Sequence, residues 1–495
     1  MSKHLWSSKW VFILAAVGSA AGLWNIWKFP FLVYDHGGWA FIIAYLVMLF
    51  VVGVSILIGE IALGQKFRSA GPNAFGNIHK NLKWLGWAFA FGTFAILSYY
   101  IVVIGWSMDY LYYSIKALFT WVLPWAGWWS DFFFNNILGI SDGVSQKGSF
   151  STPVFWWTLA SLILLYFFTR NSAKSVSKVI IYTATLPFIT LIVLAIKWVT
   201  LPGAELWLNY ILSFESAKLW SLSTWTAAAG QIFFTLSLAM WAMIVYGAFK
   251  KPKSEIAKSV VYVAIWNTII SFLSAFAVFG TLGYLATQNW VAVTEVAKWW
   301  PSLAFAIIPE TLATFSSFSA LFSVIFFVTI FFLAIDSAMA LLEAFTFPIL
   351  QRFKKLSSQQ VTAGAIILLG LVSMRYMYGN GLYLLDILDY YIQNFFMLLL
   401  GFVEILIFLY AWNKFRKFIS KHSDWLKSSY YYLITWIIWA CVLGWLLLAS
   451  FHKGVTTYDS YEAADLLNYG LYPVVWFIVV AIIINIIDPK VPKNK

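Results

Sequence analysis

The sequence contains few of the residues that most enzymes and disulfide-stabilised proteins need. Its 495 residues include one cysteine, Cys441, and five histidines. A single cysteine cannot form a disulfide within the chain, and the histidines are too scattered to form a metal-ligand pair. The sequence also lacks a P-loop motif, in which glycines and a lysine would bind the phosphates of ATP. We therefore expect neither an enzyme nor an ATP-driven pump, and no bound cofactor.

Charged residues are also scarce, at 11% of the chain, whereas 62% of the residues are apolar and 20% are aromatic. Apolar runs recur along the whole length, and each is long enough for a helix to cross a bilayer of roughly 30 Å. The abundant Trp and Tyr suit the interfaces of such a protein. We expect an all-α polytopic membrane protein with about twelve transmembrane helices, at 10–33, 39–65, 86–118, 153–168, 175–199, 226–248, 258–285, 314–349, 361–376, 386–412, 430–449 and 471–487.

The positive charge is unevenly distributed along the chain. A net charge of +12 would otherwise suggest a nucleic-acid partner. If the chain starts in the cytoplasm, however, most of its 32 Lys and Arg residues fall in connections on that side. This is the positive-inside pattern of membrane proteins. We expect a multi-pass protein of the plasma (inner) membrane with both termini cytoplasmic, and a lipid bilayer rather than nucleic acid around it.

Two apolar runs, the first and the sixth, are interrupted by small and polar residues. Small residues occupy 18–21 in the first run and precede Gly22 and Asn25, whereas Thr235 and Ser237 interrupt the sixth. Paired interruptions of this kind indicate a transporter built from inverted repeats, with its binding site near the middle of the membrane. The alternative is that small residues only let the helices pack closely. The pattern alone leaves both interpretations open.

Several longer motifs follow one another in a specific order. They are GLWNIWKFP (22–30), GE (59–60), GQ and GPNAF (64–75), YY (99–100), GQIFFTLSL (230–238), IDSAMALLE (335–343) and GFVEI (401–405). In these motifs the chain resembles the neurotransmitter:sodium symporter family, and it is similar to bacterial amino-acid transporters of that family. The resemblance covers nearly the whole chain, from Trp6 to the last apolar run. It implies sodium-driven symport by alternating access.

The resemblance also implies a leucine-transporter-type fold. In that fold two inverted repeats of five helices precede two peripheral helices, and helices 1 and 6 are unwound. On this basis residues 1–495 are one transmembrane transporter domain. The repeats would be 10–200 and 226–412, and the peripheral helices 430–487.

Sodium is a hard cation that prefers a cage of oxygen atoms, which unwound backbone and polar side chains supply. Carried over position by position, the resemblance implies a first sodium site at Ala20, Asn25, Thr235 and Asn267. It implies a second at the carbonyls of Gly18, Ala21 and Leu333 with the side chains of Asp336 and Ser337. The alternative for Asp336 is a structural carboxylate hydrogen-bonded between helices.

The substrate is implied to lie between the two unwound segments. Gly22 stands where monoamine transporters carry Asp, and it leaves room for the carboxylate of an amino acid, which Tyr100 would hold. The half-helix that follows would attract the same group with its positive N-terminal end. The implied lining is Ser19, Gly22, Trp24, Ile96, Tyr100, Phe234, Ser237, Met240, Ser337 and Leu341.

The sequence departs from the family pattern at this pocket, because Trp24 and Trp241 stand where many members have glycine. Two large rigid indoles must change the volume of the cavity or displace the backbone. We therefore expect the import of a small, hydrophobic or aromatic amino acid. The alternatives are an indole-like solute that lacks a carboxylate, and a sensor or scaffold derived from the family that binds without transport.

The resemblance finally implies two gates and an anion site. Lys28 and Asp389 occupy the positions of the outer gate pair, and Trp6 belongs to the inner gate. The inner ion pair of the family is missing, since its positions read Lys3 and Gln351, so we expect a weakly latched inner gate. A chloride site like that of animal members is implied at Tyr45, Gln231, Thr235, Asn267 and Ser271.

Overall fold

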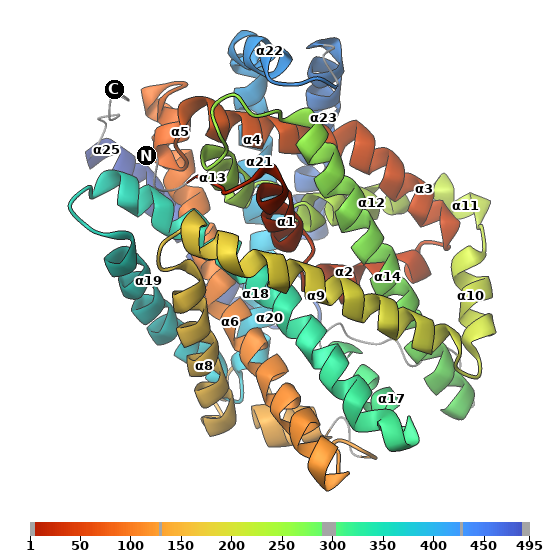
Figure 1. Cartoon of the computed structure of the whole chain (residues 1–495). Coiled ribbons are helices and arrows are strands. Elements are labelled where there is room, and N and C mark those ends of the chain that lie inside the picture. The colour runs from red at the N-terminus through yellow and green to blue at the C-terminus, as the bar shows by residue number, and fades with distance from the viewer. Residues whose placement is uncertain (1–4, 128–130, 290–302, 426–428, 488–495) are drawn as a thin grey trace.

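The computed structural model describes residues 5–127, 131–289, 303–425 and 429–487. Within these ranges the chain is helical, and strand-like pairing is limited to two isolated bridges, Gly38 with Phe214 and Phe150 with Tyr378. The expected all-α fold class is confirmed (Figure 1).

The first half of the chain contains α1 (Lys9–Ala20), α2 (Leu23–Asp35), α3 (Trp39–Met48), α4 (Val54–Phe67), α5 (Pro72–Gly76), α6 (Lys83–Thr120), α8 (Thr152–Thr169), α9 (Ala173–Val199), α10 (Ala204–Leu212), α11 (Ser216–Leu219), α12 (Leu222–Thr235) and α13 (Ala242–Ala248). The second half contains α14 (Ala257–Asn289), α17 (Ile308–Ala313), α18 (Ser319–Arg352), α19 (Ser358–Ser373), α20 (Gly381–Tyr391), α21 (Met397–Tyr410), α22 (Trp412–Lys421), α23 (Ser429–Lys453), α24 (Ala463–Leu466) and α25 (Tyr472–Ile487). Short π-helical segments join three pairs of these helices into continuous spans: Leu49–Gly53 joins α3 to α4, Ile392–Phe396 joins α20 to α21, and Leu467–Leu471 joins α24 to α25.

The described part of the chain contains ten helical segments that are long and apolar enough to cross a membrane. The bent pair α1 and α2 raises this number to eleven. The expected run at 226–248 falls on α12 and α13, each of which is too short to cross alone. The polytopic class is confirmed, whereas the count of twelve and the inverted repeat stay predictions.

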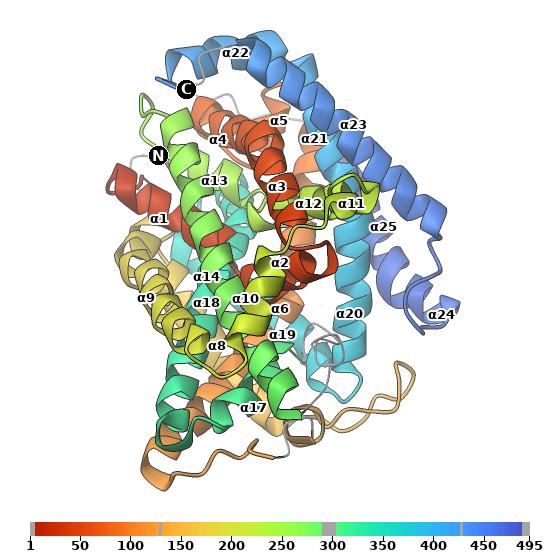
Figure 2. The ribbon, with the colours of Figure 1, turned by 90° about the vertical axis from the view of Figure 1, so that its right-hand side faces the viewer.

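Two long helices form the centre of the molecule. In the most apolar stretches of α6 and α18, 78% and 72% is buried inside the protein, and the two helices pack against each other. In the most apolar stretches of the spans that contain α23 and α25, only 22% and 17% is buried. Figure 2 shows these two helices along one edge of the molecule, outside the central group. These two helices are therefore the least covered of the spans, and α8, α9 and α19 follow, at 33%, 39% and 39% buried.

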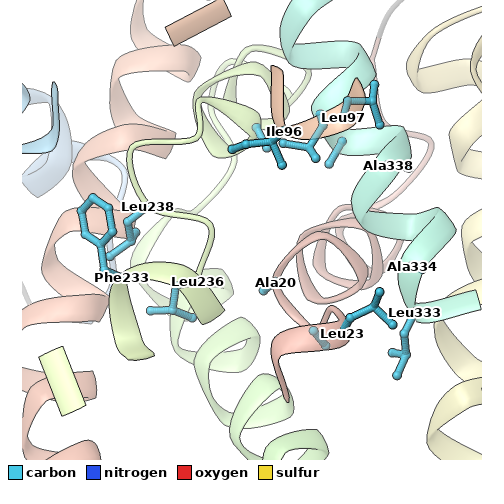
Figure 3. Packing of buried hydrophobic residues seen from close by; sticks show 14 of the residues in the cluster. Ala20, Leu23, Ile96, Leu97, Phe233, Leu236, Leu238, Leu333, Ala334 and Ala338 are labelled. Carbon is cyan, nitrogen blue, oxygen red and sulfur yellow. The ribbon is translucent and has the colours of Figure 1, made fainter. Parts of the chain in front are cut away.

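The first interruption lies between α1 and α2, whose axes differ by 64°. Ser8 caps the start of α1 by accepting a hydrogen bond from the Val11 amide at 3.2 Å. The helix ends because Ala21 leaves the helical region, with φ −82° and ψ 82°, and Gly22 is extended. Figure 3 shows Ala20 and Leu23 on either side of this break. The chain then resumes as α2 in a new direction.

The second interruption lies between α12 and α13. Ser237, Ala239 and Trp241 have positive φ angles of 52°, 54° and 65°, a conformation that L-residues other than glycine seldom adopt. Each costs of order 1 kcal/mol. The Ala239 amide, freed from the helix, donates to Glu60 Oε1 on α4 at 2.8 Å. The buried carboxylate thus satisfies a backbone donor that unwinding would otherwise leave without a partner.

Close backbone packing holds α13 against α4. A Cβ at Gly64 would lie 1.9 Å from the carbonyl oxygen of Ile244, and one at Gly247 would lie 2.5 Å from that of Ile61. No side chain fits at either contact, so both helices need glycine there. This packing fixes α13, and with it the end of the second break.

Candidate functional site

The two interruptions border one cavity, with an empty volume of about 740 Å³ including its opening. Its wall comes from α1, α2, α6, α12, α18, α20 and the segment between α12 and α13. The lining residues are Ser19, Ala20, Gly22, Leu23, Trp24, Ile96, Tyr99, Tyr100, Val103, Phe234, Ser237, Met240, Ser337, Leu341, Leu385 and Asp389. All ten residues that the sequence suggested for the substrate site are among them.

The inner polar end of the cavity is formed by Gly22, Tyr100 and Ser337. A Cβ at Gly22 would lie 2.9 Å from Ser337 Oγ and 3.6 Å from the Tyr100 hydroxyl, so a larger residue at this position would displace the serine. The Tyr100 hydroxyl faces the Ser337 side chain and the backbone amide of Leu23, in the first turn of α2. A hydroxyl and a helix N-terminus therefore point toward the same place, an arrangement suited to a carboxylate.

Aromatic and aliphatic side chains form the rest of the wall. The rings of Trp24 and Phe234 are stacked, with centroids 5.6 Å apart and planes inclined by 20°. Ile96, Met240 and Leu341 complete an apolar surface. This part of the cavity can accommodate an apolar or aromatic group.

Trp241 does not contribute to that surface. Its positive φ turns the side chain away from the cavity, and the indole is fully buried between Phe75 and Phe89, with centroid distances of 5.6 and 5.2 Å. Of the two departures from the family pattern, only Trp24 therefore reduces the space for a ligand.

A buried polar cluster lies beside the first break. Asn25 Nδ2 donates to Thr235 Oγ1 at 2.9 Å, to Asn267 Oδ1 at 3.1 Å and to Ser271 Oγ at 2.7 Å. The Gly22 amide donates to both Asn25 Oδ1 and the Ala20 carbonyl, each at 3.1 Å, so these two oxygens lie close together. The four residues expected at the first sodium site are thus neighbours. Rotation of the Asn25 amide by half a turn would add its oxygen to the cluster.

Asp336 is the most unusual residue near the break. It is 1% exposed, and neither carboxylate oxygen has a hydrogen-bond partner within 3.5 Å among the described residues; the Thr183 side chain of α9 faces the carboxylate from farther away. A Cβ at Gly18 would lie 2.6 Å from Asp336 Oδ2, so the carboxylate approaches the backbone of α1 closely. A buried carboxylate without a partner is unstable unless it is protonated or close to a cation.

Further oxygens of the expected second sodium site surround the adjacent serine. Ser337 Oγ lies 3.4 Å from the carbonyl oxygens of both Gly18 and Leu333. Ala21 forms the C-cap of α1 and is fully buried. Figure 3 shows Leu333 and Ala334 of α18 next to Leu23, across the break.

Four of the five side chains expected to bind chloride, those of Tyr45, Thr235, Asn267 and Ser271, lie together. The Tyr45 hydroxyl faces Ser271 and Asn267 and lies 3.5 Å from Thr268 Oγ1. Gln231 is 2% exposed, and both polar atoms of its amide lack a hydrogen-bond partner in the described part of the chain. Because a buried amide seldom lacks all its partners, this side chain has capacity for a ligand.

The residues of the expected outer gate are neighbours but do not form an ion pair. Asp389 accepts hydrogen bonds from the Tyr99 hydroxyl and the Gln393 amide. The Lys28 ammonium lies 5.7 Å from the Trp24 ring centroid and 6.0 Å from that of Phe31. Asp389 acts on the charge of Lys28, but no contact within 4.0 Å joins the two groups. The two gate charges are therefore separated in this structure.

Trp6, the residue expected at the inner gate, is anchored to the end of α13. This residue is 3% exposed, its indole Nε1 donates to the Tyr246 carbonyl and its amide donates to the Phe249 carbonyl, both at 3.0 Å. Lys3, the other residue considered for this gate, lies outside the described residues. Gln351 forms weaker bonds, with Asn73 Nδ2 at 3.3 Å and the Arg68 carbonyl at 3.4 Å.

Sequence reasoning missed several residues of the site. Tyr99, Val103 and Leu385 line the cavity but were not selected, although Tyr99 belongs to the YY motif. Helical spacing alone does not indicate that two consecutive tyrosines both reach the cavity wall. Glu60 of the GE motif also lies at the site, where its carboxylate joins α4 to the unwound segment by accepting from the Ala239 amide.

Comparison with known proteins gives a consistent result. The sequence model described as the sodium:neurotransmitter symporter family matches residues 3–131 and 127–490. An uncharacterized sodium-dependent transporter of Methanocaldococcus jannaschii is 35% identical over 435 residues, which are 86% of this chain and 85% of the relative. The human sodium- and chloride-dependent GABA transporter 2 is 30% identical over 420 residues, 78% of this chain and 69% of that protein. The rabbit sodium- and chloride-dependent creatine transporter 1 is 31% identical over 436 residues, covering 79% and 67%.

Proposed function

Because the chain belongs to the sodium:neurotransmitter symporter family, we propose that it imports a small, hydrophobic or aromatic amino acid together with sodium. As a member of a family of sodium-dependent transporters, the chain is a transporter and not an enzyme. Sodium is accordingly its coupling ion. The substrate, the ion sites and the gates form the proposal that follows.

The observation that carries the proposal is the carboxylate of Asp336. It is buried beside the first break without a hydrogen-bond partner among the described residues, and Gly18 lets it approach the backbone of α1. Sodium at this position would neutralise the carboxylate and coordinate the carbonyls of Gly18, Ala21 and Leu333 and the Ser337 hydroxyl. This arrangement supports a second sodium site. The alternative, a structural carboxylate bonded between helices, would depend on the Thr183 side chain of α9, which faces Asp336 but lies beyond 3.5 Å.

The first sodium site is proposed at the polar cluster of Asn25, Thr235 and Asn267 with the Ala20 carbonyl. The cluster lies next to Gly22, where we propose that the substrate carboxylate binds. An anionic group beside a cation is favourable in a low-dielectric interior, so sodium and substrate would stabilise each other there. Such mutual stabilisation is the physical basis of coupling.

The substrate side chain is proposed to occupy the apolar part of the cavity. The stacked pair of Trp24 and Phe234, with Ile96 and Leu341, favours an aromatic or branched aliphatic group over a polar one. An indole-like solute without a carboxylate would use the same wall but would leave Tyr100 and the α2 N-terminus without an anion. A sensor derived from the family would bind the same ligands without flux.

Chloride is proposed as an additional ion. The Tyr45 hydroxyl supplies a donor close to Asn267 and Ser271, and the buried Gln231 amide, one turn before Thr235 on α12, has no hydrogen-bond partner in the described chain. The names of the GABA and creatine transporters describe those relatives as chloride-dependent. A bound anion next to the first sodium site would offset part of the added positive charge.

Transport is proposed to proceed by alternating access between the two gates. Trp6 closes the inner side, whereas Lys28 and Asp389 are separated on the outer side, as expected for a protein that receives its substrate from outside. Bringing these two charges together over a loaded cavity would close the outer gate before Trp6 is released.

The orientation follows from charge. The start of α1 and the end of α25 lie at the same end of the molecule as α22, whose Lys414, Arg416 and Lys417 are exposed (Figure 1). We propose that this end is cytoplasmic, in the plasma (inner) membrane, since basic residues accumulate there. We also propose a single transporter domain with inverted repeats at 10–200 and 226–412, because the two interruptions lie at corresponding places in these repeats.

The test is uptake of labelled amino acids and of indole by proteoliposomes with an inward sodium gradient. We expect concentrative uptake of one or more hydrophobic or aromatic amino acids, which disappears when potassium replaces sodium. Asp336→Asn should lower it by at least about tenfold, because one charged sodium ligand is lost. Asp109→Asn, a buried aspartate on α6 at 3% exposure, is the matched control. Sodium-independent uptake, indole uptake alone, or binding without flux would each overturn the proposal.

A further inference from the structure

A buried lysine lies next to the inner gate. Lys250 follows the end of α13 by two residues and is 3% exposed. Its ammonium donates to the Glu255 carbonyl at 3.0 Å and to Ser259 Oγ at 3.4 Å, and it lies 3.9 Å from the centroid of the Phe12 ring. Lysine is one of the residues least often buried without a partner of opposite charge.

Three charged groups face this lysine, and none is its ion-pair partner. The Glu255 carboxylate accepts from the amides of Lys258 and Ser259, at 2.7 and 3.2 Å, and so caps α14. Lys9 of α1 adds a like charge, and Arg68 donates to the Lys250 carbonyl. The ammonium is therefore held by two neutral oxygen acceptors and one aromatic face.

This environment lowers the pKa of the Lys250 ammonium from its ordinary 10.5 to about 7. Burial is the main cause, the Glu255 carboxylate acts in the opposite direction, and Lys9 lowers the pKa further. Lysine changes its protonation state readily when it is buried.

The same contact holds the N-terminal half-helix α1 in place. Phe12 belongs to α1, and Trp6, two residues before the Ser8 cap, is hydrogen-bonded to Tyr246 and Phe249. The Trp6 ring also packs against Tyr246 and Phe249, with centroid distances of 5.0 and 5.8 Å. If α1 moves away to open the inner gate, the aromatic face over Lys250 leaves with it.

We propose that Lys250 is a proton-dependent latch of the inner gate: the amine is covered by Phe12 while α1 is closed, and it takes up a cytoplasmic proton when α1 opens. The proposal rests on the alternating access proposed above. The latch would control the inner gate, where Lys3 and Gln351 stand at the positions of the family's ion pair.

The direction of the pH effect follows from linkage. In the closed form, half of the Lys250 amines are protonated near pH 7, whereas in the open form water reaches the amine and its pKa returns toward 10.5. Between these two values, opening takes up a proton. Each unit of acidification in that range therefore favours opening by up to about tenfold. Well below pH 7 both forms are protonated, and the dependence disappears.

The experiment measures the opening of α1 directly. Spin labels are attached to cysteines at the exposed positions Ser7 and Lys174 in a Cys441→Ser background, and the distance between them is measured by pulsed electron paramagnetic resonance. The protein is in nanodiscs without substrate, in potassium buffer, at pH 6 to 9. We expect the ratio of the long-distance, open population to the closed population to fall by up to about tenfold per pH unit above pH 7 and to level off below it.

Two variants of Lys250 make opposite predictions. Lys250→Met cannot bind a proton, so the pH dependence should vanish and the closed population should dominate. Lys250→Arg stays charged at every pH used, so the dependence should also vanish but the open population should dominate. Lys251→Met, which changes the adjacent exposed lysine, should keep the wild-type profile.

A wild-type protein whose distances do not change with pH, or a Lys250→Met variant with the wild-type slope, would overturn the latch. If Lys250→Met does not fold, the Lys250→Arg profile decides alone. The readout does not require transport. If the wild-type protein shows the expected pH dependence of opening but no sodium-driven uptake, the proposed function is contradicted and the latch is not. If it shows sodium-driven uptake but no pH dependence of opening, only the latch is contradicted.

Discussion

Gly18 and Asp336 lie in direct contact across the first break: a Cβ on the glycine would be 2.6 Å from the carboxylate oxygen Oδ2. The glycine therefore allows a buried acidic group on α18 to reach the backbone of α1. This relationship joins the local irregularity of one helix to the charge on another.

Replacement of Gly18 by alanine should weaken the stabilising effect of sodium. The methyl group would displace the Asp336 carboxylate, because a contact of 2.6 Å is too short for van der Waals packing. We expect the increase in apparent melting temperature with sodium to fall clearly below the wild-type value, because the second sodium site is lost while the first remains, and ligand stabilisation follows affinity. The measurement is a thermal unfolding scan in sodium and in potassium.

Gly364→Ala is the matched control for this variant. Gly364 lies in α19, and a Cβ there would meet nothing within 4 Å. Its response to sodium should equal that of the wild type. If Gly18→Ala also keeps the full response, the carboxylate at α18 does not take part in sodium binding.

Replacement of Trp24 by alanine should change which substrates compete for uptake. The indole stacks on Phe234 in the cavity wall, and an aromatic contact of this kind is worth about 0.5–1.5 kcal/mol. Aromatic amino acids should therefore lose roughly 2- to 12-fold in apparent affinity, while larger aliphatic ones gain access. Inhibition constants from a competitor panel measure the ratio.

A variant of Trp241 distinguishes this effect from a general loss of packing. Trp241→Phe removes part of a side chain buried between Phe75 and Phe89, away from the cavity. It should lower thermal stability and leave the ratio between aromatic and aliphatic substrates unchanged. An altered ratio in this variant, with none in Trp24→Ala, would show that the cavity wall has been misassigned.

Replacement of Ala239 by glycine should stabilise the protein slightly. Ala239 has φ 54°, so glycine removes a strain of about 1–2 kcal/mol. Glycine also gives the unfolded chain more freedom, which offsets about 0.4–1 kcal/mol of this gain. We expect a net gain of up to about 1.6 kcal/mol, measured as a small rise in melting temperature in detergent.

Ala248→Gly provides the comparison for that variant. Ala248 is the last residue of α13, and glycine in a helix costs about 1 kcal/mol relative to alanine. The two changes are chemically identical but should shift the melting temperature in opposite directions. Equal destabilisation by both would mean that Ala239 carries no strain.

Replacement of chloride by gluconate should reduce sodium-driven uptake. The buried Gln231 amide has no hydrogen-bond partner in the described chain and lies in the region of the proposed anion site. Gln231→Leu should make the remaining uptake insensitive to chloride, whereas Gln359→Leu, on the exposed start of α19, should not. Wild-type uptake that is the same in chloride and gluconate would exclude an anion role for this cluster.

The apolar runs and the first break could be predicted because they depend on local composition. Hydrophobic length identifies a membrane helix, and the small residues before Gly22 indicate where one is interrupted. The residues around the cavity were found through motifs, since they come from helices far apart in the sequence. Tyr99 on α6 and Leu385 on α20 were not predicted, because the packing of these helices, and not the sequence pattern, determines which of their side chains face the cavity.

Other features depended on backbone geometry or on contacts that no pattern records. The direction of Trp241 follows from its positive φ, which a bulky residue seldom adopts. Lys250 looked like one of many basic residues in a cytoplasmic connection, and only the fold covers it with Phe12. The helix α22 was not expected, because it is not a long apolar run. Its basic residues leave only a short apolar face, in which Phe415 and Ile419 are buried.

The central claim is that the broken helices supply the oxygens that bind sodium. Its most direct test is equilibrium binding of radiolabelled sodium to the purified protein, compared with the double variant Asn25→Leu, Asp336→Asn. We expect saturable binding by the wild type and binding reduced to background in the double variant, while both proteins give the same circular dichroism spectrum. Wild-type sodium binding by a folded double variant would contradict the account.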